Sequence, residues 1–311
     1  MKVTIIIPTF NASDNLNLSL PFFEELSNHA NFDVCFIDSL SKDDTLKRLV
    51  DCDLRLIGEV DPDEFDHGGT RTFYGRLSEG DIVLYLTQDA LPFSVSDVER
   101  LVSVFHDKNV GAAFGRQIPY KETSLFGKHL RKFNYNDESY IRDINDKDLY
   151  GIKTAFLSNS FAAYRRSAMD EIGWFKDGLI LGEDTYAGAK LLKKGYKLAY
   201  VADAQVYHSH SYTVLEEFKR YFDIGVFHNM EGWILDEFGR PEGEGMRYVK
   251  SELNYLFKHN AYYLFPEFIV RNAMKYLGYK LGRNFECLPK NVVKKFSMHH
   301  RWWNKYFKEI L

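Results

Sequence analysis

Cysteine is scarce in this chain of 311 residues, which contains only Cys35, Cys52 and Cys287. Their spacing fits neither a disulfide framework nor a zinc site. Long apolar runs are also missing, since no stretch reaches the roughly 18 apolar residues of a membrane-spanning helix. The early run Val3–Ile7 is too short for the apolar core of a signal peptide. These absences predict a cytoplasmic protein that has neither disulfides nor membrane spans.

Neither sign of charge is in large excess over the whole chain, but the charge is unevenly placed. The formal net charge is −4. From residue 241 to the end, 13 Lys and Arg stand against 6 Asp and Glu, an excess of +7, so residues 1–240 carry −11. A basic end on an acidic body predicts that the C-terminal segment meets an anionic surface. Nucleic acid is not the expected partner, because the acidic body would repel a polyanion.

Short apolar strands alternate with helical patterns through about residue 117. The first strand, Val3–Ile7, is continuous and β-branched, as expected for a strand that is covered on both faces. The alternation predicts an α/β fold with a Rossmann-like, mostly parallel sheet and helices on both of its faces. The polar stretch Pro119–Lys153 is expected to be a long loop or lid. The chain after about Leu215 is expected to be helical.

Polar residues follow four successive strands of the predicted sheet. The segments are "PTFN" at residues 8–11, "DSLS" at 38–41, "FDHGGTR" at 65–71 and "TQDA" at 87–90. Because parallel strands end at the same edge of a sheet, these segments are expected to converge on one crevice. The sequence therefore predicts a ligand site at this edge.

Three residues at this edge each have a functional and a structural interpretation. Asp38 suits a nucleobase or a ribose hydroxyl, or else it caps the next turn. Arg71, which follows two glycines near a helix N-terminus, suits a diphosphate, or else it is a surface arginine after an ordinary turn. Asp89 suits Mg²⁺ or Mn²⁺, which prefer oxygen ligands, or else it is a turn or cap residue.

Two further pairs carry side chains that suit catalysis. Glu183 and Asp184 follow a glycine-containing loop, where an acid can project into a site as a general base. The structural alternative is that they favour the positive end of the helix dipole. His208 and His210 lie two residues apart in an extended segment, so they face the same side. Paired imidazoles beside an acid are candidate metal ligands, although lone histidines are usually structural.

Several strings together resemble glycosyltransferase family 2, which has the GT-A nucleotide-sugar fold. They are "VTIIIPTFNA", "FIDSLSKDDT", "DIVLYLTQDA" and "GEDTYAGAKLLKKGYKLAYVADAQVYHSHSY". The strings "FDHGGTR", "LTQDALP", "FGRQIPY", "HSHSYT" and "FSMHHRWW" resemble its bacterial rhamnosyltransferase branch. The resemblance implies an inverting transfer of L-rhamnose from dTDP-L-rhamnose to a glycan acceptor, often lipid-linked, in surface polysaccharide synthesis. It also implies a catalytic domain at 1–230, with a donor half (about 1–117) and an acceptor half (about 118–230), and a C-terminal helical segment at 231–311.

The same resemblance assigns roles to single residues. Asp184 is expected to be the general base that deprotonates the acceptor hydroxyl, with Glu183 and His67 in support. Asp89, His208 and His210 are expected to hold a divalent cation, Mg²⁺ or Mn²⁺. The expected donor-binding residues are Pro8, Thr9, Asn11, Asp38, Arg71 and Gln88. One departure is that Thr87 stands where the common Asp-x-Asp metal motif of the family has its first acid.

The C-terminal segment contains a regular apolar stripe. Val270, Met274, Leu277 and Leu281 recur at helical spacing, with Arg271 and Lys275 on a neighbouring face. The pattern resembles a basic amphipathic helix, which predicts a peripheral position on the inner face of the cell membrane. A helix packed on the catalytic domain and a homodimer interface are the alternatives.

Two other functions fit the same residues. One is a transferase of the same fold that uses another nucleotide hexose. The other is a non-catalytic protein that binds a nucleotide or glycan within an assembly complex, and Thr87 in place of an acid supports it. Asp89, Asp184 and the paired histidines favour the enzyme.

Overall fold

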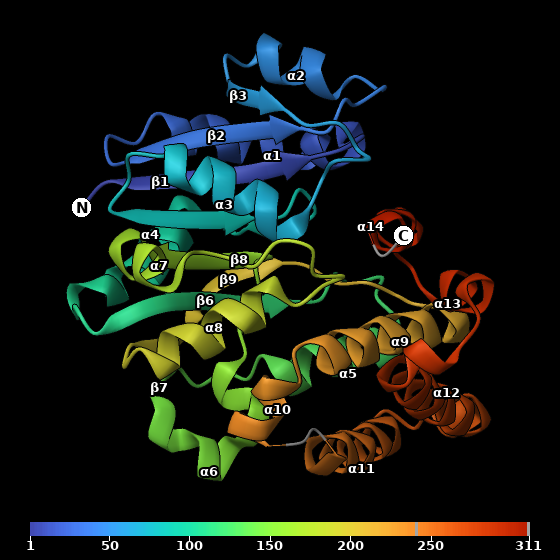
Figure 1. Cartoon of the computed structure of the whole chain (residues 1–311). Helices are drawn as coiled ribbons and strands as arrows, with labels where there is room; N and C mark the ends of the chain where they lie inside the picture. The colour runs from blue at the N-terminus through green and yellow to red at the C-terminus, as the bar shows by residue number, and fades with distance from the viewer. Residues whose placement is uncertain (240–241, 310–311) are drawn as a thin grey trace.

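A twisted central sheet forms the body of the protein, and helices cover both of its faces (Figure 1). The computed structural model describes residues 1–239 and 242–309, and within them the sheet has nine strands. The strands are β1 (Val3–Thr9), β2 (Phe32–Asp38), β3 (Arg55–Glu59), β4 (Ile82–Leu86), β5 (Leu91–Pro92), β6 (Val110–Ile118), β7 (Tyr140–Arg142), β8 (Phe161–Arg165) and β9 (Lys197–Tyr207).

The helices alternate with the strands in the first part of the chain and follow one another at its end. They are α1 (Ser13–Ser27), α2 (Thr45–Asp51), α3 (His67–Leu77), α4 (Val95–Ser103), α5 (Leu125–Asn134), α6 (Lys147–Tyr150), α7 (Arg166–Ile172), α8 (Glu183–Lys193), α9 (Val214–Met230), α10 (Gly232–Phe238), α11 (Glu242–Lys258), α12 (Phe265–Arg283), α13 (Lys290–Phe296) and α14 (His300–Glu309).

The sheet is mostly parallel, as the alternation predicts. Its order is β3-β2-β1-β4-β8-β6-β9-β5, and β7 pairs with β9. β1, β2, β3 and β4 are parallel neighbours. β8 runs against both β4 and β6, so β6 and its parallel neighbour β9 point in the same direction as β4. Only β5, β7 and β8 among the described strands point the other way.

Burial explains why β1 is a continuous apolar run rather than an alternating one. Ile5 and Ile7 pack into the core on one face of the sheet, together with side chains of α1 and α4. Ile6 packs into the core on the other face, together with side chains of α3, α7 and α8. Both faces of the strand are dry, so neither set of alternate side chains can be polar.

The stretch 119–153 is not the long loop or lid that its polar composition predicts. It contains α5, a short strand β7 and several helical turns. Phe126 and His129 on α5 are buried, and His129 Nε2 lies 2.9 Å from Ser251 Oγ on α11. The prediction is wrong because a helix that buries only a narrow stripe against another helix needs few apolar residues. Its partner, α11, also lies more than 100 residues further along the chain.

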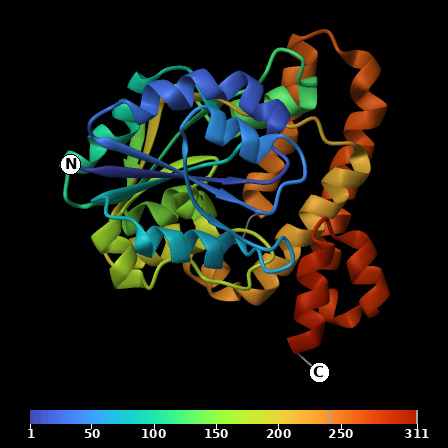
Figure 2. The same cartoon turned by 90° about the horizontal axis from the view of Figure 1, so that it is seen from above.

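Helices α9 and α12 pack closely along each other at one end of the sheet (Figure 2). Gly225 on α9 and Gly278 and Gly282 on α12 make this contact, and a Cβ on any of them would overlap a backbone carbonyl of the other helix. The face of α12 that is buried here carries Arg271 and Lys275, whereas Val270 and Leu277 are 50% and 47% exposed. Of the predicted apolar stripe, Leu281 packs against the core, whereas Val270 and Leu277 face away from it.

No helix in the described ranges has both the length and the apolar character that crossing a membrane requires.

Candidate active site

A cavity of about 580 Å³ opens beyond the carboxyl ends of β4 and β9. The loop after β4 contributes Thr87 and Asp89, and the segment after β9 contributes His208 and His210. Glu183 and Asp184, at the start of α8, line the same cavity. The predicted base and the predicted metal ligands, which lie up to 121 positions apart in the sequence, thus share one cavity.

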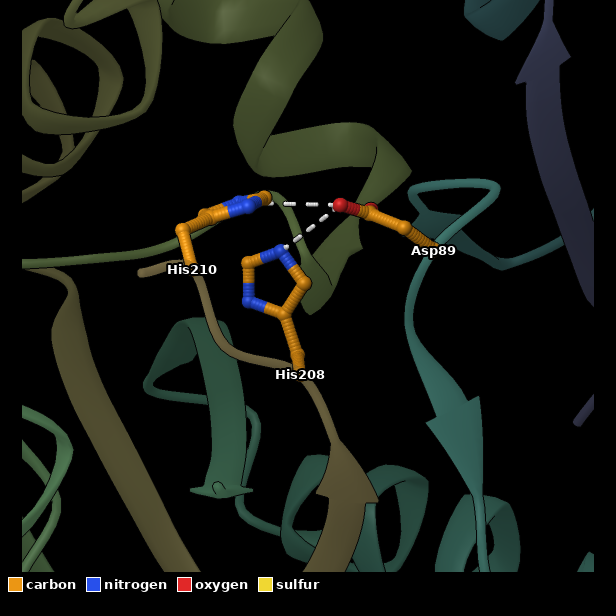
Figure 3. A group of neighbouring side chains, drawn as sticks. All are labelled: Asp89, His208 and His210. Atoms are coloured by element: carbon orange, nitrogen blue, oxygen red, sulfur yellow. Dashed lines mark ion pairs between the residues drawn. The ribbon is translucent and has the colours of Figure 1, made fainter. Parts of the chain in front are cut away.

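Asp89, His208 and His210 point toward one another across the cavity (Figure 3). Asp89 Oδ2 lies 3.3 Å from His208 Nε2 and 3.6 Å from His210 Nε2. One ligand atom from each residue fits within a group no wider than 4.8 Å. A carboxylate oxygen and two imidazole nitrogens at this spacing can hold a divalent cation.

Gln117 on β6 orients one of these imidazoles. Its Oε1 lies 2.8 Å from His208 Nδ1, and its Nε2 donates to Ser158 Oγ at 2.9 Å. With the Gln117 oxygen as acceptor, Nδ1 of the neutral His208 carries the proton, and the lone pair of Nε2 is left for a cation beside Asp89. An outer hydrogen bond of this kind commonly fixes the tautomer of a metal-binding histidine.

Electrostatics keep this group in the protonation states that bind cations. Burial lowers the pKa of His208, and burial together with the His208 charge lowers the pKa of His210 to about 4. Burial alone would raise the pKa of Asp89, but at acid pH, where His208 is protonated, its hydrogen bond and charge outweigh burial and hold the Asp89 pKa well below its usual range. Near neutral pH the site therefore offers a carboxylate and two neutral imidazoles.

The two adjacent acids at the start of α8 have opposite environments. Glu183 Oε1 lies 3.2 Å from Arg71 NH1 and accepts from Asn159 Nδ2 at 3.0 Å. Burial opposes ionisation of Glu183, but the charges of Arg71 and His67 and the Asn159 hydrogen bond lower its pKa overall. Asp184 makes no salt bridge with the described residues, and burial followed by the Glu183 charge raises its pKa to about 7, against two backbone hydrogen bonds and the charge of Arg71. Such a split assigns different roles to two neighbouring acids.

The turn that presents these acids depends on Gly182. Its φ is +82°, in the left-handed region, and a Cβ there would crowd the ring of Phe227. Asp184 Oδ1 accepts from the N–H of Thr185 at 2.7 Å, and its Oδ2 accepts from the N–H of Asn159 at 3.3 Å. These contacts fix the carboxylate at the cavity wall.

Arg71 and His67, which are both on α3, lie beside the two acids of α8. Arg71 NH1 is 3.2 Å from His67 Nδ1, and both side chains line the cavity. The glycines that precede Arg71 have a structural role that the sequence did not reveal. A Cβ on Gly68 would overlap the carbonyl of Lys176, so this glycine lets α3 pack on the 176–177 backbone.

The remaining predicted donor residues lie at the ends of β1 and β2 and, for Gln88, in the loop after β4. Asp38 is fully buried and accepts from Thr9 Oγ1 at 3.0 Å and from the N–H of Ser41 at 2.7 Å. Asn11 Oδ1 accepts from the N–H of Lys42 at 2.9 Å, and Pro8 is half-buried. Gln88 exchanges hydrogen bonds with the backbone of Phe10 at 2.8 and 3.2 Å. None of these residues lines the cavity of Asp89 and Asp184.

The structure adds residues that the sequence analysis missed. His299 from the C-terminal segment lines the cavity, and its ring centre lies 6.3 Å from that of His67. Both histidines also line a neighbouring cavity of about 1,040 Å³ beside α14. Asn159 contacts both acids, and Arg131 and Arg220 line the cavity wall. "FGRQIPY" and "FSMHHRWW" contain Gln117 and His299, so these strings were the only available signal.

Comparisons with known proteins identify the family of the chain. The family model described as "Glycosyl transferase family group 2" matches residues 82–221. The chain is 43% identical over 303 residues to the O-antigen chain rhamnosyltransferase WbaN of Salmonella anatum, covering 97% of this chain and 95% of that protein. It is 42% identical over 305 residues to the O-antigen chain rhamnosyltransferase RfbN of Salmonella typhimurium, covering 98% and 96%.

Solved structures with little sequence identity share the fold. The mannosyltransferase PcManGT from Pyrobaculum calidifontis, in complex with GDP-Man and Mn²⁺, superposes with a TM-score of 0.65 at 15% identity, over 92% of this chain and 88% of that chain. TarS 1–349 from S. aureus, in complex with UDP-GlcNAc, gives a TM-score of 0.58 at 14% identity, over 99% and 92%. The predicted GT-A fold is confirmed, and the chain belongs to glycosyltransferase family 2, in its bacterial rhamnosyltransferase branch.

Proposed function

We propose that this glycosyltransferase moves L-rhamnose from dTDP-L-rhamnose, with inversion at the anomeric carbon, to a growing O-antigen glycan on a lipid carrier. The assignments of the sugar and of the polysaccharide come from the two relatives that match nearly the whole chain, because their names state rhamnosyl transfer to an O-antigen chain. The assignments of the nucleotide and of the lipid carrier come from the resemblance of the sequence motifs to the family. PcManGT and TarS bind GDP-Man and UDP-GlcNAc, so a nucleotide-sugar donor also fits the fold.

The proposal rests mainly on Glu183 and Asp184, two adjacent acids in the cavity whose pKa values are shifted in opposite directions. A general base works best when its pKa lies near the operating pH. The pKa of Asp184, raised to about 7 by burial and by the Glu183 charge, meets this condition. Asp184 takes the proton of the acceptor hydroxyl while the hydroxyl oxygen attacks the anomeric carbon. The bond between that carbon and the diphosphate oxygen breaks at the same time. Glu183 stays ionised beside Arg71 and cannot accept a proton as readily.

The donor set of Asp89, His208 and His210 fits a divalent cation. Three ligand atoms converge within 4.8 Å, and Gln117 fixes the tautomer of one of them. When bound, Mg²⁺ or Mn²⁺ supplies positive charge that stabilises the leaving diphosphate. Mn²⁺ is favoured over Mg²⁺ because two of the three ligands are imidazoles. The two histidines take the place of the first acid of the Asp-x-Asp motif, where this chain has Thr87.

The donor is proposed to extend from this cavity along the sheet edge. Arg71 faces the diphosphate, with His67 beside it. Pro8, Thr9, Asn11, Asp38 and Gln88 support the loops around the nucleoside. The polar strand ends and their positive-φ residues, Asn11 at +48° and Leu40 at +53°, support this assignment, because strained backbone gathers at ligand sites.

The outer face of α12 is proposed to bind a membrane surface, which places the enzyme on the inner face of the cell membrane beside a lipid-linked acceptor. Ile269, Val270, Tyr276 and Leu277 are exposed there by 64%, 50%, 64% and 47%. Aromatic and apolar side chains on one helix face suit the lipid interface. A second copy of the chain could cover the same face. Co-sedimentation with anionic vesicles and the mass of the protein in solution separate the two partners.

The direct test is turnover with a panel of nucleotide sugars and lipid-linked glycans. We expect transfer from dTDP-L-rhamnose at a rate at least about tenfold above that from UDP- or GDP-hexoses. Preference for a UDP- or GDP-sugar would leave the fold and mechanism intact but overturn the rhamnose assignment. Binding of dTDP without any turnover would instead favour a non-catalytic role.

A further inference from the structure

The active-site cavity carries positive charge that its carboxylates do not neutralise. Its lining includes the cations Arg71, Arg131, Lys153, Arg220 and Lys275. Three of them have acidic partners. Arg71 pairs with Glu183 at 3.2 Å, Lys153 with Glu244 at 3.0 Å, and Lys275 with Glu217 at 3.5 Å.

Arg131 and Arg220 differ from the other three cations. In residues 1–239 and 242–309, no carboxylate lies within 4.0 Å of either guanidinium group. Nε of Arg131 is also buried without a hydrogen-bond partner among the described residues. Arg220 is exposed to the cavity, and its guanidinium carbon lies 5.7 Å from the ring centre of Tyr212.

The two arginines come from different helices and lie near each other. Arg131 is on α5 and Arg220 on α9, yet both line the wall near Asp89, His208 and His210. Burial lowers the pKa of Arg131 most; Tyr135, Tyr212 and Asp89 act against this, and the charge of Arg220 lowers the pKa further, as expected for two like charges in one cavity. Two neighbouring guanidinium groups that make no salt bridge with the described residues raise the energy of the free protein. An anion bound between them would remove that cost.

We propose that Arg131 and Arg220 form a diphosphate-binding pair, which holds the anion beside the site of Asp89, His208 and His210. Guanidinium groups bind phosphate oxygens with two parallel, charge-assisted hydrogen bonds. A cation at Asp89 and the arginine pair would then contact the same anion from two sides. The identity of the anion rests on the proposed function, but its binding does not.

Two molecules in the proposed reaction carry a diphosphate. One is the nucleotide-sugar donor, and the other is an acceptor glycan on a lipid diphosphate. The recognition chemistry is the same for both. Arg131 and Arg220 belong to the acceptor half of the catalytic domain, whereas Asp89 belongs to the donor half, so the position of the pair fits either source.

The test compares charge removal at these positions with charge removal one residue away. The variants are Arg131→Gln and Arg220→Gln, and the matched controls are Lys132→Gln and Lys219→Gln on the same helices. Neither control residue lines the cavity. Arg131→Lys keeps the charge and should retain part of the binding. Circular dichroism and the melting temperature establish that each variant is folded.

Calorimetry with dTDP, thymidine and inorganic pyrophosphate forms the donor arm. Loss of a charge-assisted hydrogen bond should weaken binding by roughly tenfold or more. If the donor diphosphate is the ligand, the Kd for dTDP and pyrophosphate rises by this factor in both variants, and the Kd for thymidine does not change. The controls should stay within about twofold of the wild type.

Steady-state kinetics form the acceptor arm. If the lipid diphosphate is the ligand, dTDP binding is unchanged, but KM rises at least about tenfold for the lipid-diphosphate-linked acceptor. KM for the same glycan released from its lipid diphosphate should not change. The proposal is overturned if folded variants match the wild type in both arms, or if the controls lose as much as the variants.

The two arms also separate this inference from the proposed function. If the wild-type protein binds dTDP or pyrophosphate through the two arginines but never transfers rhamnose, the functional proposal fails and the anion site stands. If the wild-type protein transfers rhamnose and the arginine variants do so equally well, the anion site fails and the function stands.

Discussion

Two parts of one sheet edge use polar residues in opposite ways. At the ends of β1 and β2, Asp38 is fully buried, and its oxygens are occupied by Thr9 and Ser41. At the ends of β4 and β9, the ligand atoms of Asp89, His208 and His210 converge on one another instead. The first group satisfies its own hydrogen bonds, whereas the second brings together ligand atoms at a spacing that suits a divalent cation.

The difference shows how one edge can be both rigid and reactive. Satisfied buried polar groups stabilise a loop and specify its conformation. Converging charges and lone pairs cost stability unless a ligand is bound, and they are therefore a mark of function. Sequence position alone did not separate the two groups, because both are polar strand ends. The hydrogen-bond partners separate them.

The largest effect is expected at Asp184. Asp184→Asn removes the proposed base, and kcat should fall by about 10³-fold, within the usual range for general-base catalysis. The measurement is release of dTDP in the presence of acceptor. Asp203→Asn, at an exposed position on β9, is the matched control and should keep full activity. A folded Asp184→Asn enzyme with more than a tenth of wild-type kcat would contradict the assignment.

The cation site should show the next largest effect. His208→Ala and His210→Ala each remove a proposed ligand, so calorimetry with Mn²⁺ should give a Kd raised by about 100-fold. His259→Ala, which removes an exposed imidazole elsewhere, should leave Mn²⁺ binding unchanged. Unaltered Mn²⁺ affinity in both ligand variants would mean that the three side chains hold no metal.

At the satisfied end of the edge, the expected effect is on stability. Asp38→Ala leaves the N–H and Oγ donors of Ser41 without their acceptor, and should lower the free energy of unfolding by about 2 kcal/mol. Asp38→Asn keeps one carbonyl oxygen and should lose less. Urea denaturation followed by circular dichroism gives the values. An Asp38→Ala variant as stable as the wild type would show that the hydrogen bonds at the ends of β1 and β2 do not stabilise the protein, which would contradict the role given to this group.

The smallest effect is expected at Gln117. Gln117→Leu removes the acceptor that orients His208, and should weaken Mn²⁺ binding by about tenfold, as is usual for an outer hydrogen bond. Gln205→Leu on β9 is the matched control, because its side chain makes only a long hydrogen bond of 3.4 Å to Ala202. Equal affinities in the two variants would show that the tautomer needs no support from Gln117.

Local sequence signals predicted the first part of the fold well. The apolar run of β1 and the helix–strand alternation up to residue 117 reflect short-range periodicity, which the sequence displays directly. The prediction of a loop at 119–153 was wrong because α5 packs against α11, a helix far along the chain. The same reason explains α12, whose Arg271 and Lys275 are buried against Glu217 and Glu252 rather than exposed.

The candidate site was predictable where motifs carried it. Asp89, Asp184 and the two histidines lie in recognisable strings, and the structure brings them into one cavity. Arg131, Asn159 and Arg220 lie outside the recognised strings, and only tertiary contacts bring them to the cavity. The predicted division at residue 230 stays a prediction, but Arg220 and Lys275, on either side of it, line the same cavity.

The pH dependence of kcat/KM for the wild-type enzyme tests the central claim most directly. The base must be ionised to accept a proton, and burial and the Glu183 charge raise the pKa of Asp184 to about 7. The rate should therefore rise with pH, about tenfold per unit below pH 6, and level off above pH 8. A profile that is flat between pH 5.5 and 8.5 would contradict Asp184 as the general base.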